Sequence, residues 1–408
     1  MLKKIYFHID FDAFFASVEE ILHPQYQNKP VVVCAMHENS VCCSANYLAR
    51  SYGIKAGMPV FQIKKIAPKN TIYTVSHLDL YDEVSDEVFN YIRNNINRKI
   101  TIYSIDECWL EFDKSNIKHN DNYYLNKAKN LQENILNKFK LSVSIGIGKS
   151  MFLAKMASDF KKPYGITCIL NQEDIETKLW PLDINKMFMV GKNLSKKLNE
   201  LKIYTIKDLA NYKDFNKLKK ILTKNYINYL YDAKGIEHET SFNKDLAKSF
   251  SIKRTFTSSL ANEEEIKEYS NYMIHELTNY LNNNKAKAKR LVCHVENIKH
   301  EIYTTKTDLA KAINEFSDLS LELYNLFEHA NLNNNLPIRS LNFILSNISY
   351  DELNNQLDLN EYLSLNNKDK ANINWQNQVK QIINEAAKKE LDLNNANKLN
   401  LTKKAFRH

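Results

Sequence analysis

Apolar residues follow two different spacings along this chain, and changes between them divide it into segments. Short apolar runs of strand length occur at Ile5–Ile9, Ile100–Ser104, Glu107–Phe112, Ser142–Gly146 and Thr167–Leu170. Apolar residues at helical spacing predict helices over Leu80–Asn97 and Tyr123–Phe139. Together, residues 1–22 and 80–172 predict an α+β layer, with helices on one face of a mostly antiparallel sheet.

A smaller segment, residues 23–79, interrupts this layer. It contains the apolar strand Val31–Cys34, a predicted helix over Ser44–Tyr52 and a Gly-Met-Pro turn at Gly57–Pro59. The strand pattern is lost near Glu173, and residues 173–237 are predicted to be helical and are rich in lysine. We therefore expect a small separate domain inside the layer and a helical domain after it.

A strand–helix pattern returns after a polar linker at residues 238–247. The predicted order is β-α-β-β-α-β, with strands at Ser249–Thr255, Arg290–Glu296, Glu301–Thr305 and Arg339–Ser346, and helices at Glu263–Leu281 and Leu309–Phe327. Residues 350–408 are rich in Asn and weakly periodic, so we expect a mobile tail with one helix near Gln376–Leu391.

Composition narrows the class of protein without defining it. The chain of 408 residues is long enough for several domains, and its net charge of +8 permits a nucleic-acid partner. No apolar run approaches the ~20 residues of a membrane helix, and we recognise no signal peptide. The six cysteines have no CxxC spacing, so we expect reduced thiols in the cytosol.

Two acidic signatures, YFHIDFDAFFASVEE and YSIDECWLEF, place carboxylates at strand ends. Asp10 ends the first predicted strand, and Asp106 and Glu107 lie at the bend of a strand pair. Such carboxylates are costly to bury unless a cation neutralises them, and oxygen-rich clusters suit Mg²⁺. Two ions could then hold the attacking and leaving oxygens of an in-line displacement. The alternative is that Asp10 and Asp12 cap the helix that starts near Ala13.

A second candidate group lies on the predicted helix over Ser44–Tyr52. Its members Ser44, Tyr47 and Arg50 are three residues apart and would share one helix face. A hydroxyl, a phenol and a guanidinium near a helix N-terminus suit a triphosphate. The alternative is an ordinary amphipathic helix, with the serine as N-cap and the arginine in solvent.

Four motifs, in this order along the chain, resemble those of a known enzyme family. They are DFDAFFASVEE, SANYLARSYGIKAGMP, SIDECWLEF and SIGIGKSMFLAKMASDFKKPYGI. The chain resembles the Y-family of lesion-bypass DNA polymerases, of the bacterial DNA polymerase IV type, from Ile5 to about Ser349. The resemblance implies template-directed, low-fidelity DNA synthesis across damaged bases by two-metal nucleotidyl transfer, without proofreading.

The resemblance also implies an architecture. We expect an α+β, multidomain right-hand polymerase whose ferredoxin-like palm is formed by residues 1–22 and 80–172. The small fingers would be residues 23–79, the helical thumb residues 173–237 and the little finger residues 248–349.

The same resemblance assigns roles to residues at the candidate site. Asp10, Asp106 and Glu107 would be catalytic and would hold two Mg²⁺ ions, which Mn²⁺ can replace, together with the Phe11 carbonyl. The residues assigned to nucleotide binding are Phe14, Phe15, Ser44, Tyr47, Arg50 and Lys162. Of the two adjacent rings, which point in different directions on a helix, that of Phe15 would exclude a ribose 2′-hydroxyl. The alternative is that both rings are ordinary core.

DNA contacts are expected in the thumb and the little finger. The segment Met189–Leu209 resembles a helix-hairpin-helix in which Met189 and Lys202 replace common glycines, and a DNA phosphate would bind near Gly191 and Lys192. In the little finger the expected DNA-binding residues are Lys248, Ser249, Ser251, Lys253, Arg254 and Arg339. A solvated sheet face is the alternative for this second group.

The tail contains Gln356, Leu357 and Leu359, which resemble a clamp-binding peptide with Asn360 in place of the usual aromatic residue. The expected partners are therefore primer–template DNA, deoxynucleoside triphosphates and a bacterial sliding clamp, for a monomeric protein of the cytoplasm and nucleoid.

Three other classes remain as alternatives. Asp10-Phe11-Asp12 imitates the DxD motif of haloacid-dehalogenase-type phosphatases, in which Asp10 would be the nucleophile. A nucleotidyl cyclase shares paired strand carboxylates, and a non-catalytic, clamp-tethered DNA-binding protein would share the basic segments.

Overall fold

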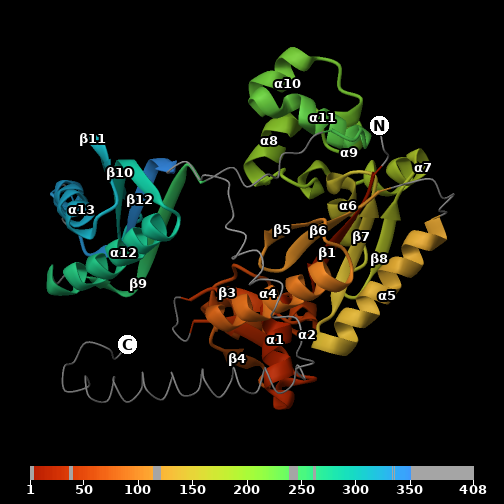
Figure 1. Cartoon of the computed structure of the whole chain (residues 1–408), viewed down its shortest axis with the longest axis horizontal. Coiled ribbons are helices and arrows are strands. Elements are labelled where there is room, and N and C mark those ends of the chain that lie inside the picture. Colours follow the sequence, from red (N-terminus) through yellow and green to blue (C-terminus); the bar gives the residue numbers. More distant parts are fainter. Residues whose placement is uncertain are drawn as a thin grey trace, which may run out of the picture. The chain divides into compact units, whose positions relative to one another are not determined.

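The computed structural model describes residues 4–35, 40–113, 121–238, 247–260, 263–332, 334 and 336–350. The described residues up to 238 belong to one compact unit and those from 247 to a second (Figure 1). Within these ranges no helix is both long and apolar enough to cross a membrane. The predicted linker between the units and the predicted tail helix lie largely outside the described residues.

The first sheet is the central layer of the first unit. Its five strands have the order β5-β6-β1-β7-β8, and only the β7–β8 pair is parallel. The strands are β1 (Lys4–Phe11), β5 (Ile100–Ser104), β6 (Glu107–Asp113), β7 (Val143–Gly148) and β8 (Ile166–Ile169). The predicted sheet, mostly antiparallel, is confirmed.

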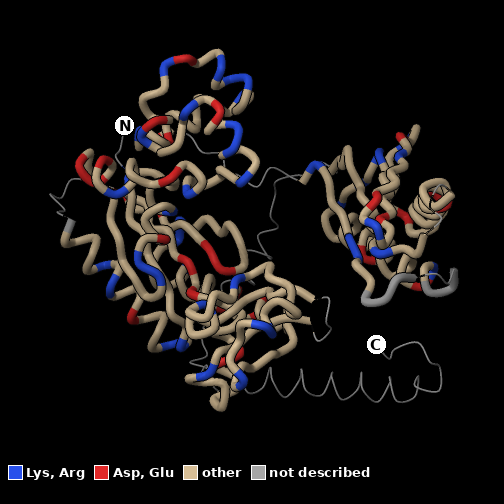
Figure 2. Tube along the Cα trace, turned by 180° about the vertical axis from the view of Figure 1, so that it is seen from behind, with Lys and Arg blue, Asp and Glu red and all other residues tan. Residues whose placement is uncertain are grey.

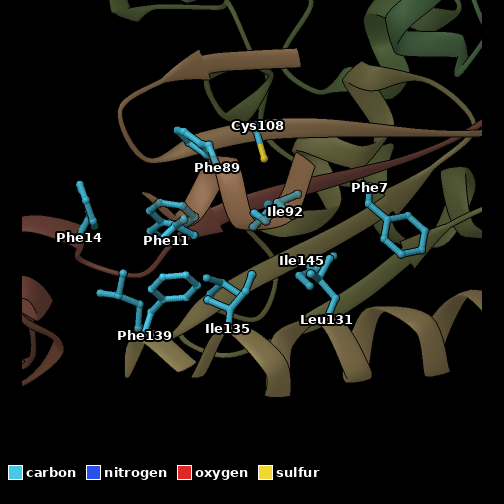
Figure 3. Close-up of a cluster of buried hydrophobic side chains, with 14 of the residues drawn as sticks. Phe7, Phe11, Phe14, Phe89, Ile92, Cys108, Leu131, Ile135, Phe139 and Ile145 are labelled. Carbon is cyan, nitrogen blue, oxygen red and sulfur yellow. The ribbon is translucent and has the colours of Figure 1, made fainter. Parts of the chain in front are cut away.

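One face of this sheet is buried by two long helices, α4 (Leu78–Asn95) and α5 (Asp121–Phe139). In Figure 3, Leu131, Ile135 and Phe139 of α5 point toward the strands. Alternate residues of β1 are buried in this core. Because successive strand residues point to opposite faces, His8 and Asp10 are directed to the other face of the sheet.

The expectation that helices cover only one face is wrong, because α6 (Met151–Ser158) packs on the other face. Ser158 lies with its hydroxyl 2.8 Å from Nδ1 of His8. Two glycines of β7 allow this close approach: a Cβ on Gly146 would overlap the carbonyl oxygen of Ala154, and one on Gly148 would lie 2.5 Å from the Ala154 nitrogen. The glycines thus let α6 lie close to β7 and to its neighbour β1, which carries Asp10.

A second sheet, of order β3-β2-β4, is formed by residues between β1 and α4. Its strands are β2 (Val31–Cys34), β3 (Cys42–Ala45) and β4 (Ile72–Thr74), and the helices around it are α1 (Phe14–Leu22), Pro24–Tyr26, α2 (Tyr47–Ser51) and α3 (Val60–Ile66). The helix predicted to begin at Ser44 begins later, because Ser44 belongs to β3 and Asn46 is the N-cap.

Asn46 also joins the start of α2 to β2 of this sheet and to α1. Its side-chain oxygen accepts hydrogen bonds from the nitrogens of Ala49 and Val31, and its amide nitrogen donates to Glu20 and to the carbonyl of Lys29. The buried amide therefore has four partners, which fix the start of α2.

The lysine-rich segment is helical, as predicted, and its apolar residues pack against the side of α6 that carries Phe152, Leu153 and Met156. Lys and Arg positions, blue along the Cα trace, are frequent in it (Figure 2). Its helices are α7 (Gln172–Asp174), Ile175–Leu179, Ile184–Lys186, α8 (Lys192–Glu200), α9 (Ile206–Ala210), α10 (Phe215–Leu222), Thr223–Asn225 and α11 (Tyr226–Lys234).

The second unit contains a four-stranded antiparallel sheet of order β11-β10-β12-β9. Its elements are β9 (Ser249–Leu260), α12 (Glu263–Asn283), β10 (Ala286–Asn297), β11 (Ile302–Ile313), α13 (Phe316–Asn331) and β12 (Ile338–Tyr350), and the two helices share one core with the sheet. The order of elements is the predicted one. The predicted start of the second helix at Leu309 is wrong, because β11 continues to Ile313 and α13 begins at Phe316.

The helix α8 ends in a Schellman motif built on a lysine. The nitrogen of Lys202 donates to the Asn199 carbonyl at 2.9 Å, and that of Ile203 donates to the Leu198 carbonyl at 3.1 Å. Lys202 has φ 61°, in the left-handed region that glycine adopts without strain. Met189 adopts a similar φ of 68°. Both residues thus keep a glycine-like backbone at positions where the family resemblance expects glycine.

We predict that Lys202→Gly stabilises the protein by about 0.5–1 kcal/mol, because it removes the left-handed strain of a non-glycine residue. Urea unfolding measures the change. The matched control is Lys197→Gly within α8, which should destabilise by about 1 kcal/mol because it places glycine in a helix interior. Destabilisation by Lys202→Gly as large as that of the control would contradict the interpretation.

Candidate active site

A cavity of about 250 Å³ lies in the first unit, where β1 and the β5–β6 turn meet α1, β3 and α2. All residues that the sequence predicted to be catalytic, metal-binding or nucleotide-binding line it. The full lining is Asp10, Phe11, Ala13, Phe14, Phe15, Cys43, Ser44, Tyr47, Arg50, Ala56, Asp106, Glu107 and Lys162. Residues far apart in the sequence are therefore brought to one site.

Adjacent strands place the carboxylates at one edge of this cavity. Asp10 near the end of β1 is paired with Glu107 at the start of β6. Asp106 lies in the turn before β6, where its carboxylate accepts a 2.7 Å hydrogen bond from the Ser104 hydroxyl. The Asp106 carbonyl accepts a hydrogen bond from the Phe11 nitrogen, which ties the turn to β1.

Two lysines balance the charge of these carboxylates. The Nζ atom of Lys155 on α6 lies 2.8 Å from Glu107 and 3.2 Å from Asp10. The Nζ atom of Lys162 lies 2.6 Å from Asp10 and 2.9 Å from Asp159. Lys155 was missed by the sequence analysis. The available signal was a lysine within FLAKMAS, an apolar helix with no polar face to receive it.

Burial raises the pKa values of Asp10 and Glu107, and the neighbouring cations lower them. Burial raises the pKa of Asp10 to about 6, although Lys162 and Lys155 favour its charged form. Burial also raises the pKa of Glu107, but His8 and Lys155 outweigh it, and the net pKa lies well below the usual value. A further cation beside Asp10 would act in the same direction as the two lysines and favour the charged form of its carboxylate.

The donor set fits a divalent cation that takes only part of its ligands from the protein. In the described parts of the chain no three His, Cys, Asp or Glu side chains converge closely enough to enclose an ion. Mg²⁺ commonly uses one or two carboxylates and completes its shell with water and substrate phosphate. Asp10, Asp106 and Glu107 supply such carboxylates on one side of an open cavity.

The two adjacent phenylalanines of α1 have different environments, as expected from their helical spacing. Both line the cavity, but Phe14 is buried in the core, whereas Phe15 is half-buried. The Phe15 ring stacks on Tyr81, with centroids 4.4 Å apart and an interplanar angle of 16°. The position of the Phe15 ring therefore depends on Tyr81.

Tyr81 is fixed in turn by Glu19, a buried carboxylate that the sequence analysis missed. Glu19 accepts hydrogen bonds from Tyr81 at 2.6 Å, from the His77 ring at 2.9 Å and from Thr74 at 3.3 Å. Burial raises the pKa of Glu19, but hydrogen bonds from His77 and Tyr81 outweigh burial and lower it overall.

The phosphate-binding candidates come from two elements. Ser44 lies on β3, so the expectation that it shares a helix face with Tyr47 and Arg50 is wrong, although all three line the cavity. The Arg50 guanidinium lies 4.8 Å from the centroid of the Tyr47 ring, and its Nε donates to the Ala45 carbonyl at 2.8 Å.

Asp12 does not cap α1, so this reading of the sequence is also wrong. The N-cap residue is Ala13, and no side chain caps the helix. The Asp12 carboxylate instead accepts hydrogen bonds from Tyr47 and from residues near β7 and β8.

The residues predicted to bind DNA lie outside the cavity. Gly191 is the N-cap of α8 and Lys192 its first residue, and both are exposed. The remaining predicted DNA-binding residues belong to the second unit. The edge strand β9 carries four exposed members, Ser249, Ser251, Lys253 and Arg254, and Lys248 immediately precedes it. Arg339 is half-buried on β12.

One of these residues already has an acidic partner in the fold. The Nζ atom of Lys253 lies 3.0 Å from Glu296 on β10. A DNA phosphate would have to share or replace this contact. The clamp-peptide candidates Gln356, Leu357 and Leu359 lie outside the described residues.

Comparisons with known proteins agree with this arrangement. Residues 9–159 match the model of the impB/mucB/samB family, and residues 247–359 match the C-terminal domain of that family. The chain is 33% identical over 327 residues to a DNA polymerase IV of Ureaplasma parvum, covering 80% of this chain and 90% of the relative. It is 29% identical over 375 residues to a DNA polymerase IV of Oceanobacillus iheyensis, covering 91% of this chain and 87% of the relative.

Solved structures give the same result. A Y-family DNA polymerase chimera of Dbh and Dpo4 matches with a TM-score of 0.74 and 28% identity, covering 85% of this chain and all of that one. An insertion ternary complex of Dbh DNA polymerase matches over the same shares of both chains with a TM-score of 0.57 and 28% identity.

The chain therefore belongs to the Y-family of DNA polymerases. Membership makes it a DNA-directed DNA polymerase of the lesion-bypass class, with the right-hand architecture of that class. Enzymes of this family are generally dependent on divalent metal. The phosphatase and the non-catalytic DNA-binding alternatives are not favoured.

We predict that Glu19→Gln destabilises the protein by about 1–3 kcal/mol at pH 7, because an amide replaces an ionised acceptor of buried hydrogen bonds. The folded-state pKa of Glu19 lies below its unfolded value, so its stabilising effect is present above the unfolded pKa of about 4.3 and is lost as pH falls through the folded pKa.

Urea unfolding at pH 7 and at mildly acidic pH measures this difference between the two proteins, which should shrink on acidification. Glu83→Gln, at an exposed position of α4, is the matched control and should leave stability nearly unchanged. Equal stability of Glu19→Gln and wild type at pH 7 would contradict the assigned hydrogen bonds.

Proposed function

We propose that the cavity at the end of β1 is the nucleotidyl-transfer site of this polymerase. In this reaction the primer 3′-hydroxyl attacks the α-phosphate of a bound deoxynucleoside triphosphate, and pyrophosphate leaves. The observation that supports the proposal best is that the candidate acids and the candidate phosphate ligands, predicted separately from distant motifs, line one cavity.

Asp10, Asp106, Glu107 and the Phe11 carbonyl are proposed to hold two Mg²⁺ ions, with Mn²⁺ as a substitute. When bound, two such ions would stabilise the attacking and leaving oxygens and the charge that develops between them. The protein's own part is to hold its carboxylates in place: the β1–β6 pairing sets the separation of Asp10 and Glu107 before any ligand binds.

The triphosphate is proposed to bind Ser44, Tyr47, Arg50 and Lys162. Arginine can contact phosphate through two parallel hydrogen bonds, and lysine contacts it as a point charge. The Lys162 ammonium contacts Asp10 and Asp159, so binding a phosphate would require it to exchange carboxylate oxygens for phosphate oxygens. Such an exchange keeps the charge at this side of the cavity balanced.

Primer–template DNA is proposed to contact Gly191 and Lys192 at the start of α8, and the basic residues Lys248, Lys253, Arg254 and Arg339 with Ser249 and Ser251 in the second unit. Backbone contacts of this kind position DNA without reading its sequence. Residues 1–22 and 80–172, which contain the sheet of β1, would then be the palm, residues 23–79 the fingers, residues 173–237 the thumb and residues 248–349 the little finger, in a monomer acting at the nucleoid.

We predict that Asp106→Asn reduces primer extension by at least about 10²-fold while DNA affinity stays unchanged, because it removes a charge near the reacting atoms and little volume. Extension of a labelled primer on a defined template, with Mg²⁺ and deoxynucleotides, provides the test. Asp113→Asn, at the exposed far end of β6, is the matched control and should remain active. Extension by Asp106→Asn close to that of the control would refute the assignment.

We predict that Phe15→Ala admits ribonucleotides while deoxynucleotide insertion stays measurable, since the ring that would clash with a 2′-hydroxyl is gone. The ratio of kcat/KM for the two sugars measures selectivity and should fall by at least tenfold, or about 1.4 kcal/mol. Phe61→Ala, at an exposed phenylalanine of α3, controls for loss of a ring elsewhere. An unchanged sugar ratio would mean that another group selects the sugar.

A sliding clamp is the proposed protein partner, bound through Gln356, Leu357 and Leu359. We predict that alanine at these three positions abolishes clamp stimulation on a long primed template and leaves unstimulated insertion unchanged, because tethering acts through effective concentration. Asn360→Phe should strengthen binding by adding an apolar anchor. Equal clamp affinity of the wild type and the triple variant would show that the segment is only a linker.

A further inference from the structure

Asp12 is a buried carboxylate, 2% exposed, to which none of the roles above is assigned. Each of its oxygens accepts two hydrogen bonds. Oδ1 accepts from the Ser144 hydroxyl at 2.8 Å and from the Tyr47 hydroxyl at 3.3 Å. Oδ2 accepts from the Ser142 hydroxyl at 2.7 Å and from the Tyr164 backbone nitrogen at 2.8 Å.

The donors to Asp12 come from three separate segments. Ser144 lies in β7 and Ser142 just before it, Tyr47 is the first residue of α2, and Tyr164 lies in the turn that leads to β8. The Asp12 backbone is fixed as well, because its nitrogen donates to the Ser142 carbonyl at 2.9 Å. The two serines thus hold the carboxylate on the central sheet, and the two tyrosines are attached to it.

Each of the two tyrosines that donate to Asp12 lies next to a charged residue that lines the cavity. Tyr47 lies beneath the guanidinium of Arg50, and both line the cavity. Tyr164 is two residues after Lys162, which lines the cavity and contacts Asp10. Tyr164 has φ 57°, a strained conformation for a non-glycine residue, and its nitrogen is held by Asp12.

We propose that Asp12 is a positioning residue for the triphosphate. One carboxylate sets the spacing between the Tyr47–Arg50 wall and the Lys162 turn, so that both reach phosphates of the same nucleotide. It acts through Tyr47 and the Tyr164 backbone and does not itself touch substrate. This inference rests on the proposed function, because it requires that these walls bind the triphosphate.

A carboxylate is needed here for a chemical reason. Four donors converge on two oxygens, and an amide of the same shape offers only one oxygen plus an NH₂ group that would face two donors. Asp12→Asn therefore preserves volume but loses contacts on one side. Losing hydrogen bonds to a charged acceptor predicts a rise of about 10–100-fold in the KM for the incoming nucleotide.

The test is single-nucleotide insertion by the full-length protein on a primed template, with KM and kcat measured separately and DNA affinity measured by anisotropy. Asp12→Asn should raise the nucleotide KM by the stated factor, change kcat by a few-fold at most and leave DNA affinity unchanged. The matched control is Ser17→Ala, which removes a 2.7 Å hydrogen bond to the Asp12 carbonyl and not to its carboxylate, and should leave KM unchanged.

A double-mutant cycle tests the route of the effect. Tyr47→Phe removes the hydroxyl that donates to Asp12. The fold-increase in KM of the double variant should therefore be smaller than the product of the fold-increases of the two single variants. Full multiplicativity, or an unchanged KM in Asp12→Asn, would overturn the inference. A loss confined to kcat would overturn it as well, since positioning of the nucleotide must change binding.

A second variant covers the case in which Asp12→Asn fails to fold. Replacing Ser142 and Ser144 with Ala frees the carboxylate from the sheet and leaves its bonds to both tyrosines, so the nucleotide KM should rise in the same direction. An unchanged KM there would overturn the inference. A wild-type protein that inserts no nucleotide would instead refute the proposed function itself, and the inference with it.

Discussion

Burial of negative charge at the end of β1 is the constraint on which the site depends. Asp10 and Glu107 are opposed on adjacent strands, and taking two carboxylates out of water without a cation would cost several kcal/mol. The fold supplies that cation through α6, which approaches the sheet closely because β7 has glycines at the contact and which carries Lys155. The strand register places the two carboxylates together, the two glycines admit α6, and α6 supplies the lysine that compensates their charge. The cavity lies beside these carboxylates.

Three buried polar residues then join the surrounding segments to this sheet. Asn46 fixes the start of α2, Asp12 links α2 and the Lys162 turn to β7, and Glu19 fixes the Tyr81 ring against Phe15. Each is satisfied by several donors or acceptors, as buried polar groups must be if they are not to destabilise the fold. The walls of the cavity are therefore positioned by hydrogen bonds and its edge by strand pairing.

Sequence patterns predicted the elements well and the contacts between them poorly. Apolar runs identified the strands, and the motifs identified the residues that share the cavity. Ser44 was assigned to a helix because spacing alone does not show where a helix begins, and Asn46 is the residue type that caps it. Leu309 was assigned to a helix because the apolar residues of Leu309–Ile313 (LAKAI) fit the spacing of a helix as well as that of a strand. The hydrogen-bond donors to the Asp12 carboxylate lie 35 or more residues away, and Asp10 and Glu107 lie 48 or more residues from Lys155, so no local pattern could reveal these contacts.

The central proposal is that the carboxylates of Asp10, Asp106 and Glu107 hold divalent ions and that Lys162 moves from Asp10 to phosphate when substrates bind. Anomalous scattering from Mn²⁺ tests it most directly, in crystals of the protein with primer–template DNA and a non-reactive deoxynucleotide. The account predicts metal peaks in contact with the carboxylates of Asp10, Asp106 and Glu107, with Lys162 moved from Asp10 to phosphate. Ordered substrates with no metal peak at these carboxylates, and Lys162 still paired with Asp10, would contradict it.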